Sequence, residues 1–202
     1  MFEKIESFPC AEVNTAFCDL TVPCNASYDI IVTDSKTGKT KEKGALMKYW
    51  DIFESELGPI QVICDEEWVL GVEFGSEAPK EGLKKSTDLI KKTVFQLNEY
   101  LIGERTEFDL PLKPEGTAFQ KKVWEALCTI PYGQTRSYKE IAVQIGNEKA
   151  CRAVGMANNR NPIPIIIPCH RVIGADKSLV GYGGGLNIKV KLLNLESPGS
   201  TW

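Results

Sequence analysis

The sequence predicts an α/β protein with a small α/β unit in its first part and a mostly helical second part. Two segments, 60–64 and 68–74, are rich in branched and aromatic side chains and are separated by acidic residues, a pattern typical of paired strands. Apolar residues recur at helical spacing over 86–102 and again over 119–127. Two prolines lie between these helices, so we expect a linker between the units.

These patterns divide the chain into three parts. Residues 1–46 form an extension whose role the sequence does not indicate, 47–112 form the α/β domain, and 113–202 form the helical domain. The extension contains three cysteines among turn-forming residues: Cys10, Cys18 and Cys24. A zinc site there would need closer cysteine pairs or a histidine partner, so we predict no metal site.

Two short helices follow within the helical domain. Ser137 and Glu140 form a capping-box pattern that starts a helix running through Ile145. Gly146 ends this helix, and a second helix is expected over about 148–157. Two short helices joined across a glycine turn predict a helix-turn-helix.

The second of these helices is unusual for a reader of the major groove. Such helices carry several long polar side chains that reach base edges. Here Arg152 is the main long basic residue, and the rest of the helix is rich in small residues: Ala150, Ala153, Gly155 and Ala157. Small residues suit close approach to a shallow surface such as a minor groove, or simple packing against the core, and the sequence leaves both interpretations open.

A cysteine lies beside the only histidine of the 202 residues. Cys169 and His170 follow the apolar run 163–167, which we expect to be a buried strand or extended segment. A thiol attacks as thiolate and needs a base or positive surroundings to lower its pKa from about 8.5. His170 is the one residue that can supply a neutral imidazole. The pair predicts a nucleophilic cysteine, and a packed cysteine beside a solvated histidine is the alternative.

Charge is divided unevenly along the chain. Residues 1–113 carry 13 Lys+Arg and 21 Asp+Glu, whereas residues 114–202 carry 11 and 6, so the net charges are −8 and +5. This asymmetry suggests that the second part binds a polyanion. Seven irregularly spaced cysteines argue against a disulfide framework and favour a reducing compartment, the cytoplasm or a eukaryotic nucleus. We expect no membrane association, because no apolar run approaches the roughly 18 residues of a spanning helix.

An ordered set of motifs covers the second half of the chain. They are Arg152-Ala153-Val154-Gly155, Asn161-Pro162, Ile167-Pro168-Cys169-His170-Arg171-Val172, Gly181-Tyr182-Gly183-Gly184-Gly185, Leu192-Leu193 and Glu196. Together they resemble the methylated-DNA–protein-cysteine methyltransferases, which repair alkylated guanine, and the resemblance extends over about residues 48–197. It implies a ribonuclease-H-like α/β domain followed by a helical domain that holds the helix-turn-helix and the cysteine.

The resemblance also implies roles for individual residues. Cys169 would accept the alkyl group, His170 would act through a bridging water, and Glu196 would orient and charge-stabilise the imidazole. Asn161 would hold the turn before the active segment. Tyr138 would crowd the phosphate 3′ to the damaged base, help to rotate the base out, and protonate the leaving guanine.

Further residues are expected to contact DNA or the extruded base. Arg152 would fill the space that the base leaves in the stack. The other expected DNA contacts are Lys139, Asn147 and Gln120. The expected base pocket consists of Pro164, Val172, Tyr182 and the backbone N–H near Gly183.

The implied reaction is a direct, irreversible, single-turnover transfer from O6-alkylguanine to Cys169, with no cofactor. O4-methylthymine is a further candidate substrate. The expected partner is double-stranded DNA that contains alkylated bases, and we expect a monomer.

Three other functions compete with this one. A damage sensor of the same fold would lack the acceptor, which Cys169 argues against. A helix-turn-helix regulator would explain the basic second half but leaves the Cys-His pair without a role. A thiol hydrolase would use a similar Cys-His-acid set, but it needs an open substrate cleft and no DNA-binding helix.

Overall fold

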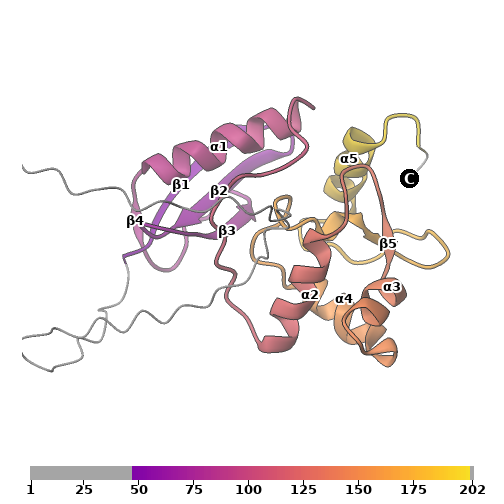
Figure 1. Ribbon diagram of the computed structural model, residues 1–202. Coiled ribbons are helices and arrows are strands. Elements are labelled where there is room, and N and C mark those ends of the chain that lie inside the picture. The colour runs from indigo at the N-terminus through magenta and orange to yellow at the C-terminus, as the bar shows by residue number, and fades with distance from the viewer. Residues whose placement is uncertain (1–46, 201–202) are drawn as a thin grey trace, which may run out of the picture. The chain divides into compact units, whose positions relative to one another are not determined.

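The computed structural model describes residues 47–200, so the predictions for the extension 1–46 and its three cysteines lie outside the described residues. Its first part contains a four-stranded sheet in the order β3-β2-β1-β4 (Figure 1). The strands are β1 (Tyr49–Ser55), β2 (Gly58–Cys64), β3 (Val69–Phe74) and β4 (Leu83–Lys84). The first three pair antiparallel, and β4 pairs parallel to β1 at the edge.

The sequence prediction is confirmed for β2 and β3, but it misses β1. Six of the seven residues of β1 are half-buried and only Glu54 is exposed, so the strand shows no alternation between buried and exposed side chains. Period-two alternation is the signal by which a half-buried strand is recognised in a sequence. Pairing with β2 along its whole length is what makes this segment a strand.

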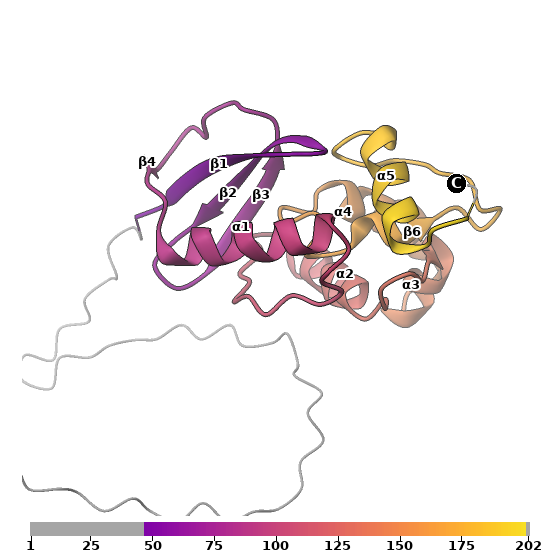
Figure 2. The ribbon, with the colours of Figure 1, turned by 90° about the horizontal axis from the view of Figure 1, so that it is seen from above.

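Helix α1 (Asp88–Leu101) packs against the sheet, and it runs along one face of it in Figure 2. The side chain of Thr87 caps its first turn by accepting a hydrogen bond from the N–H of Ile90. The helix ends before Gly103, whose φ of 79° is accessible to glycine at little cost. The helix predicted over 86–102 is confirmed, and its buried face includes Tyr100.

The second part is mostly helical, as the sequence predicts. Its α-helices are α2 (Ala118–Cys128), α3 (Tyr138–Gln144), α4 (Cys151–Asn159) and α5 (Leu186–Glu196). Two short 3₁₀ helices, η1 (Glu148–Ala150) and η2 (Cys169–Arg171), and two short parallel strands, β5 (Arg136–Ser137) and β6 (Val172–Ile173), complete it. Within residues 47–200, no helix is long and apolar enough to cross a membrane.

The helix-turn-helix is formed by α3 and α4. The Ser137 hydroxyl accepts from the N–H of Glu140 at 3.2 Å, and the Glu140 carboxylate accepts from the N–H of Ser137 at 2.7 Å, which confirms the capping box. Gly146, with φ of 76°, ends the first helix. The second begins with the 3₁₀ turn η1 and continues as α4 to Asn159, two residues beyond the predicted end.

The apolar run 163–167 is a tight turn, so the strand expected there is wrong. The N–H of Ile167 donates to the carbonyl of Ile163 at 2.9 Å, and Ile165 adopts the left-handed region with φ of 73°. The Asn161 side chain accepts from the N–H of Ile163 and donates to the carbonyl of Ile167, at 3.0 and 2.8 Å. These two bonds, together with a proline at the second position of the run that has no N–H for a ladder, favour the turn over a strand.

The turn is nevertheless buried, as the sequence predicts, and it contacts the sheet. Ile163, Ile165 and Ile167 are all within the core. The N–H of Val72 in β3 donates to the carbonyl of Pro162 at 2.9 Å. The α/β part is therefore bonded directly to the backbone that leads into Cys169.

Candidate active site

Cys169 is the first residue of η2 and is only 3% exposed. Its Sγ accepts a hydrogen bond from Asn161 Nδ2 at 3.0 Å, and its carbonyl accepts from Asn158 Nδ2 at 3.2 Å. Burial raises the pKa of the Cys169 thiol to about 11, against the hydrogen bond from Asn161 and the positive charge of Lys189, which lower it. The sulfur is thus protonated at neutral pH and needs a base before it can act as a nucleophile.

His170, the residue that follows Cys169 in the sequence, is fully buried. Its Nε2 lies 2.9 Å from Glu196 Oε1, whereas its Nδ1 has no hydrogen-bond partner within residues 47–200. Burial lowers the pKa of His170, although the hydrogen bond and charge of Glu196 oppose this shift. A neutral imidazole that donates from Nε2 keeps the Nδ1 lone pair available to accept a proton, so His170 has the form that a general base requires.

Glu196, at the end of α5, is the acceptor on which the site converges. It accepts from Nε2 of His170, from Nε and an amino group of Arg171, from the Tyr100 hydroxyl and from the N–H of Gly133. Burial acts to raise the pKa of Glu196, but the hydrogen bonds from His170 and Arg171 outweigh it and lower the pKa to about 2. The carboxylate is therefore charged and held in place, and the predicted contact with the imidazole is present.

Two tyrosines predicted for the site lie near the sulfur. Tyr138, the first residue of α3, donates its hydroxyl to the carbonyl of Val180 at 2.9 Å. Burial, followed by the charge of a Cys169 thiolate, raises the pKa of Tyr138 to about 12. The same two causes raise the pKa of Tyr182, which is buried. Both phenols are thus protonated at neutral pH, and each is able to donate a proton or a hydrogen bond.

The remaining residues expected around the base differ in accessibility. Val172 is completely buried and Pro164 is half-buried in the turn, whereas Gly183 is exposed in the loop before α5. A side chain on Gly183 would have its Cβ 3.3 Å from the carbonyl oxygen of Asn159, at the end of α4. The glycine-rich loop therefore lies against the second helix of the helix-turn-helix.

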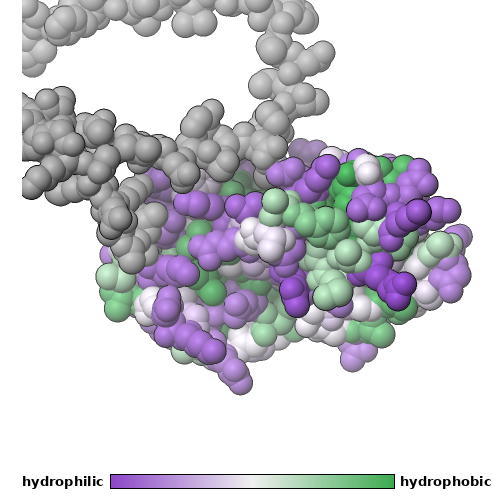
Figure 3. Space-filling view, turned by 90° about the horizontal axis from the view of Figure 1, so that it is seen from below, coloured by the Kyte–Doolittle hydropathy of each residue, from purple (hydrophilic) through white to green (hydrophobic). Residues whose placement is uncertain are grey.

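Three of the five residues expected to contact DNA are exposed, whereas Tyr138 and Gln120 are half-buried. Lys139 on α3, Asn147 between the helices and Arg152 on α4 all face solvent. Gln120 is half-buried and instead closes a capping box, with its Oε1 accepting from the N–H of Thr117 at 2.8 Å. From below, hydrophilic residues are interspersed with hydrophobic ones on the surface (Figure 3).

Sequence reasoning missed four contributors to the site. Tyr100 lies within the apolar helix predicted over 86–102, and Arg171 lies in the Cys-His motif, but neither position predicts a role in the site. Asn158 on α4 gave no signal. Lys189 also gave none, yet its side chain is completely buried and donates to the carbonyls of Val172 at 2.6 Å and Val180 at 3.2 Å. Burial lowers the pKa of Lys189 to about 8, against the charge of a Cys169 thiolate.

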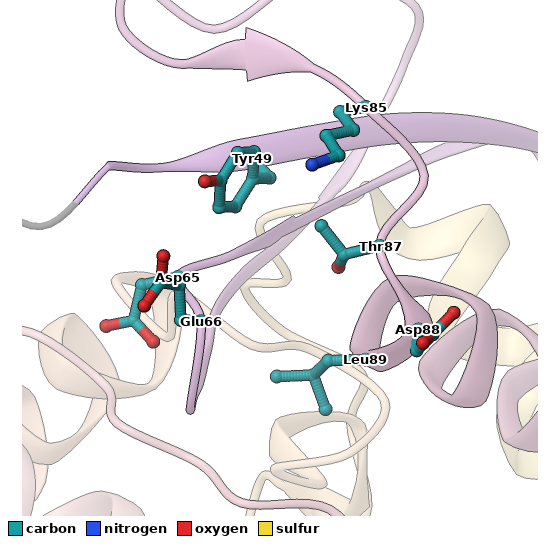
Figure 4. Close-up of a pocket in the computed structure, with 7 residues that line it drawn as sticks. All are labelled: Tyr49, Asp65, Glu66, Lys85, Thr87, Asp88 and Leu89. Carbon is teal, nitrogen blue, oxygen red and sulfur yellow. The ribbon is translucent and has the colours of Figure 1, made fainter.

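A separate pocket lies in the α/β part, between β1, the turn after β2 and the start of α1 (Figure 4). Its acidic side chains are Asp65, Glu66 and Asp88. The Asp65 carboxylate stabilises this turn by accepting hydrogen bonds from the backbone N–H groups of Glu67 and Trp68. Among residues 47–200, no three His, Cys, Asp or Glu side chains are grouped so that they could hold a metal ion.

Comparison with known proteins agrees with this architecture. Two domain families match: the ribonuclease-like domain of 6-O-methylguanine DNA methyltransferase over residues 48–114, and the DNA-binding domain of the same enzyme over residues 118–198. The methylated-DNA–protein-cysteine methyltransferase of Methanosarcina barkeri is 52% identical over 153 residues, which are 73% of this chain and 96% of that protein.

Solved structures give the same result. The O6-methylguanine methyltransferase of Mycobacterium tuberculosis is 45% identical and aligns with a TM-score of 0.69 over 77% of this chain and 96% of its own. A structure of Mycobacterium tuberculosis OGT in complex with DNA is 47% identical, with the same TM-score over 73% and 92% of the two chains. The fold class predicted from the sequence is confirmed, and the chain belongs to the methylated-DNA–protein-cysteine methyltransferases.

Proposed function

We propose that this protein repairs DNA by moving an alkyl group from O6 of guanine to its own Cys169. The observation that carries the proposal is the buried series Cys169, His170 and Glu196, in which the imidazole is bonded to the carboxylate at 2.9 Å and its other nitrogen is left unbonded within residues 47–200. Family membership supplies the substrate class, and this series supplies a nucleophile and its base.

The chemistry begins with the thiol proton. His170 Nδ1 takes this proton from Cys169 through a bridging water, and the resulting imidazolium is stabilised by Glu196. Lys189 contributes a positive charge close to the sulfur, which favours the thiolate. The thiolate then attacks the alkyl carbon, so that a carbon–sulfur bond forms while the bond from that carbon to guanine O6 breaks.

The leaving guanine needs a proton, which Tyr138 supplies. Its phenol is protonated at neutral pH and near Cys169, and its present acceptor is only a loop carbonyl, that of Val180. A donor placed at the developing negative charge lowers the barrier of such a step. The imidazolium of His170 then gives its proton to the Tyr138 phenolate. The products are neutral guanine and a thioether on Cys169.

Burial of the sulfur determines how the substrate must enter. An alkyl group on O6 of guanine lies inside the duplex, and Cys169 lies inside the protein at 3% exposure. The nucleotide therefore has to rotate out of the stack, which costs a few kcal/mol. We place the extruded base against Tyr182, Pro164, Val172 and the exposed backbone of Gly183, with Asn161 holding the turn beneath it.

DNA is held by the exposed side of the helix-turn-helix, through Lys139, Asn147 and Arg152. The excess of basic residues in 114–202 suits contact with phosphates, which makes the binding weakly dependent on sequence. Gln120 contributes only if it leaves its capping box. We propose that the protein acts as a monomer on alkylated duplex DNA, in the cytoplasm or in a eukaryotic nucleus, and needs no cofactor because Cys169 is the acceptor.

A mass measurement tests this function. After incubation with duplex DNA that contains O6-methylguanine, the intact protein should gain the mass of one methyl group in place of one hydrogen. Peptide mapping should locate it at Cys169, and the yield should stop at one methyl per protein because the thioether is stable. A protein that binds the lesion but gains no mass would be a damage sensor, and a methyl on another cysteine would contradict the assignment of the acceptor.

Arg152→Ala should impair the extrusion of the base. Arg152 is exposed on α4, and without its side chain nothing fills the gap in the base stack. We expect transfer from O6-methylguanine in duplex DNA to slow by about tenfold or more, since stabilising a flipped state is worth a few kcal/mol. Transfer from the free base O6-methylguanine should change little.

Arg160→Ala is the matched control for this prediction. Arg160 is exposed at the C-terminal end of the same helix and carries the same charge. It should lower duplex affinity modestly without changing the ratio of duplex to free-base rates. Equal losses on both substrates in Arg152→Ala would show that Arg152 has no part in flipping.

A further inference from the structure

We propose that Tyr100 is a positioning residue for alkyl transfer: its hydroxyl holds the Glu196 oxygen that bonds His170, so helix α1 of the α/β domain completes the hydrogen-bond network of the active site. The inference rests on the proposed function for its readout in reaction rate. Its geometric basis is independent of that function.

The contact joins two distant parts of the sequence. The Tyr100 side chain is completely buried, and its hydroxyl donates to Glu196 Oε1 at 2.5 Å, across 96 residues of sequence. The same hydroxyl oxygen lies 3.3 Å from Nε2 of His170. Tyr100 thus contacts both members of the pair that prepares the base, although it belongs to the helix that covers the sheet.

Tyr100 and His170 bond the same oxygen of the Glu196 carboxylate, and this allows Tyr100 to affect the charge state of His170. Oε1 accepts from Tyr100 and from His170, whereas Oε2 accepts from the N–H of Gly133 and shares the guanidinium of Arg171 with Oε1. A donor at Oε1 draws negative charge away from the oxygen that the imidazole faces. Because that charge is what stabilises an imidazolium, Tyr100 favours the neutral, proton-accepting form of His170.

Other groups near His170 act on its charge as well. The titratable and charged side chains that act on its imidazole are Glu196 and Lys189 from α5, Arg171 from η2 and Tyr100 from α1, and the Cys169 thiol accepts from the His170 backbone N–H. Burial keeps the Tyr100 phenol protonated by raising its pKa well above the usual value, and the charge of Glu196 adds to this. Tyr100 therefore remains a donor across the whole pH range in which His170 can titrate.

The test is Tyr100→Phe in the full-length, untagged chain, which removes one oxygen and keeps the ring. Since His170 is the only histidine, a single ¹³Cε1 resonance of labelled histidine reports its pKa directly. We expect this pKa to rise by about one unit on loss of a hydrogen bond to a charged carboxylate. The pH below which the transfer rate declines should shift upward by the same amount. At pH values below the His170 pKa of both proteins, the rate constant of the variant should therefore be about tenfold lower than that of the wild type.

Tyr132→Phe is the matched control. Its hydroxyl donates to the carbonyl of Leu195 in α5 at 3.3 Å, and its ring packs edge-on against Tyr100 with centroids 6.0 Å apart. It removes a comparable hydrogen bond next to the network without touching Glu196 or His170, so the His170 titration should remain that of the wild type.

The outcomes separate this inference from the proposed function. An unchanged or lowered His170 pKa in Tyr100→Phe, or an equal rise in Tyr132→Phe, would overturn the role of Tyr100 even if alkyl transfer proceeds. Absence of transfer in the wild type would refute the function and leave the His170 titration to decide on Tyr100. If Tyr100→Phe does not fold, the wild-type proton spectrum decides instead: a slowly exchanging hydroxyl proton with a cross-peak to the His170 ring supports the contact, and its absence contradicts it.

Discussion

Cys169→Ser should abolish alkyl transfer completely while leaving the binding of methylated duplex within a few-fold of the wild type. A hydroxyl is nearly isosteric with a thiol, so the buried site and its bond from Asn161 Nδ2 should persist. Serine is a far weaker nucleophile at neutral pH, and a buried site disfavours the alkoxide even more than the thiolate. Stoichiometric transfer from labelled DNA measures the first effect, and fluorescence anisotropy measures the second.

Cys151→Ser provides the control for this substitution. Cys151 begins α4, is half-buried against the core, and donates its thiol to the carbonyl of Glu148 in the preceding turn at 3.6 Å. This variant should transfer one methyl per protein at the wild-type rate. Residual stoichiometric transfer by Cys169→Ser would mean that another residue is the acceptor.

Glu196→Gln should cause the largest loss of stability. Glu196 and Arg171 are each 6% exposed, and the carboxylate accepts from five groups. An amide at this position places an NH₂ against donors and leaves the buried guanidinium of Arg171 without its counter-charge. Breaking a buried ion pair in this way typically costs about 3–5 kcal/mol. Chemical denaturation measures the loss, and Glu104→Gln, at an exposed carboxylate, should be nearly neutral.

The same variant should alter the pH dependence of stability. The folded-state pKa of Glu196 is lowered from 4.5 to about 2, so its contribution is complete above pH 4.5 and is lost as the pH falls towards 2. The size of that contribution is on the order of 3 kcal/mol. The lowered pKa of His170 also makes the protein less stable in acid, because on acidification the imidazole takes up a proton in the unfolded chain at a higher pH than in the folded one. Glu196→Gln should therefore flatten the acid limb of wild-type stability, and an unchanged limb would contradict the role of Glu196.

Local sequence patterns predicted the local structure well. The capping box of Ser137 and Glu140, the glycine turn at Gly146 and the periodicity of α1 each depend on residues within a few positions of one another. The adjacency of Cys169 and His170, together with the motifs around them, was sufficient to indicate the family. The roles of the individual site residues remain predictions.

The sequence patterns failed in two places: at β1, where pairing with another strand decides the structure, and at 163–167, where hydrogen bonds from a neighbouring side chain decide it. Strand β1 exists because β2 pairs with it, and the run 163–167 turns because one side chain, Asn161, bonds both of its ends. A row of isoleucines predicts burial correctly, but burial is compatible with a strand or with a turn. The hydrogen bonds of a single asparagine decide between them, and their geometry is not encoded in the apolar pattern.

The sequence by itself determined the family, the two-part organisation and the identity of the candidate nucleophile and base, because these depend on motifs and on neighbours along the chain. The resemblance added Glu196, and only the tertiary structure showed that Tyr100, Arg171 and Lys189 also surround them. Tyr100, His170 and Glu196 come from three separate elements, with separations of 70 and 26 residues, and they meet at one carboxylate oxygen. Whether a buried polar side chain finds such a partner depends on how the helices pack, and hydrogen bonds over distances of 2.5–3.3 Å are formed only after that packing is complete.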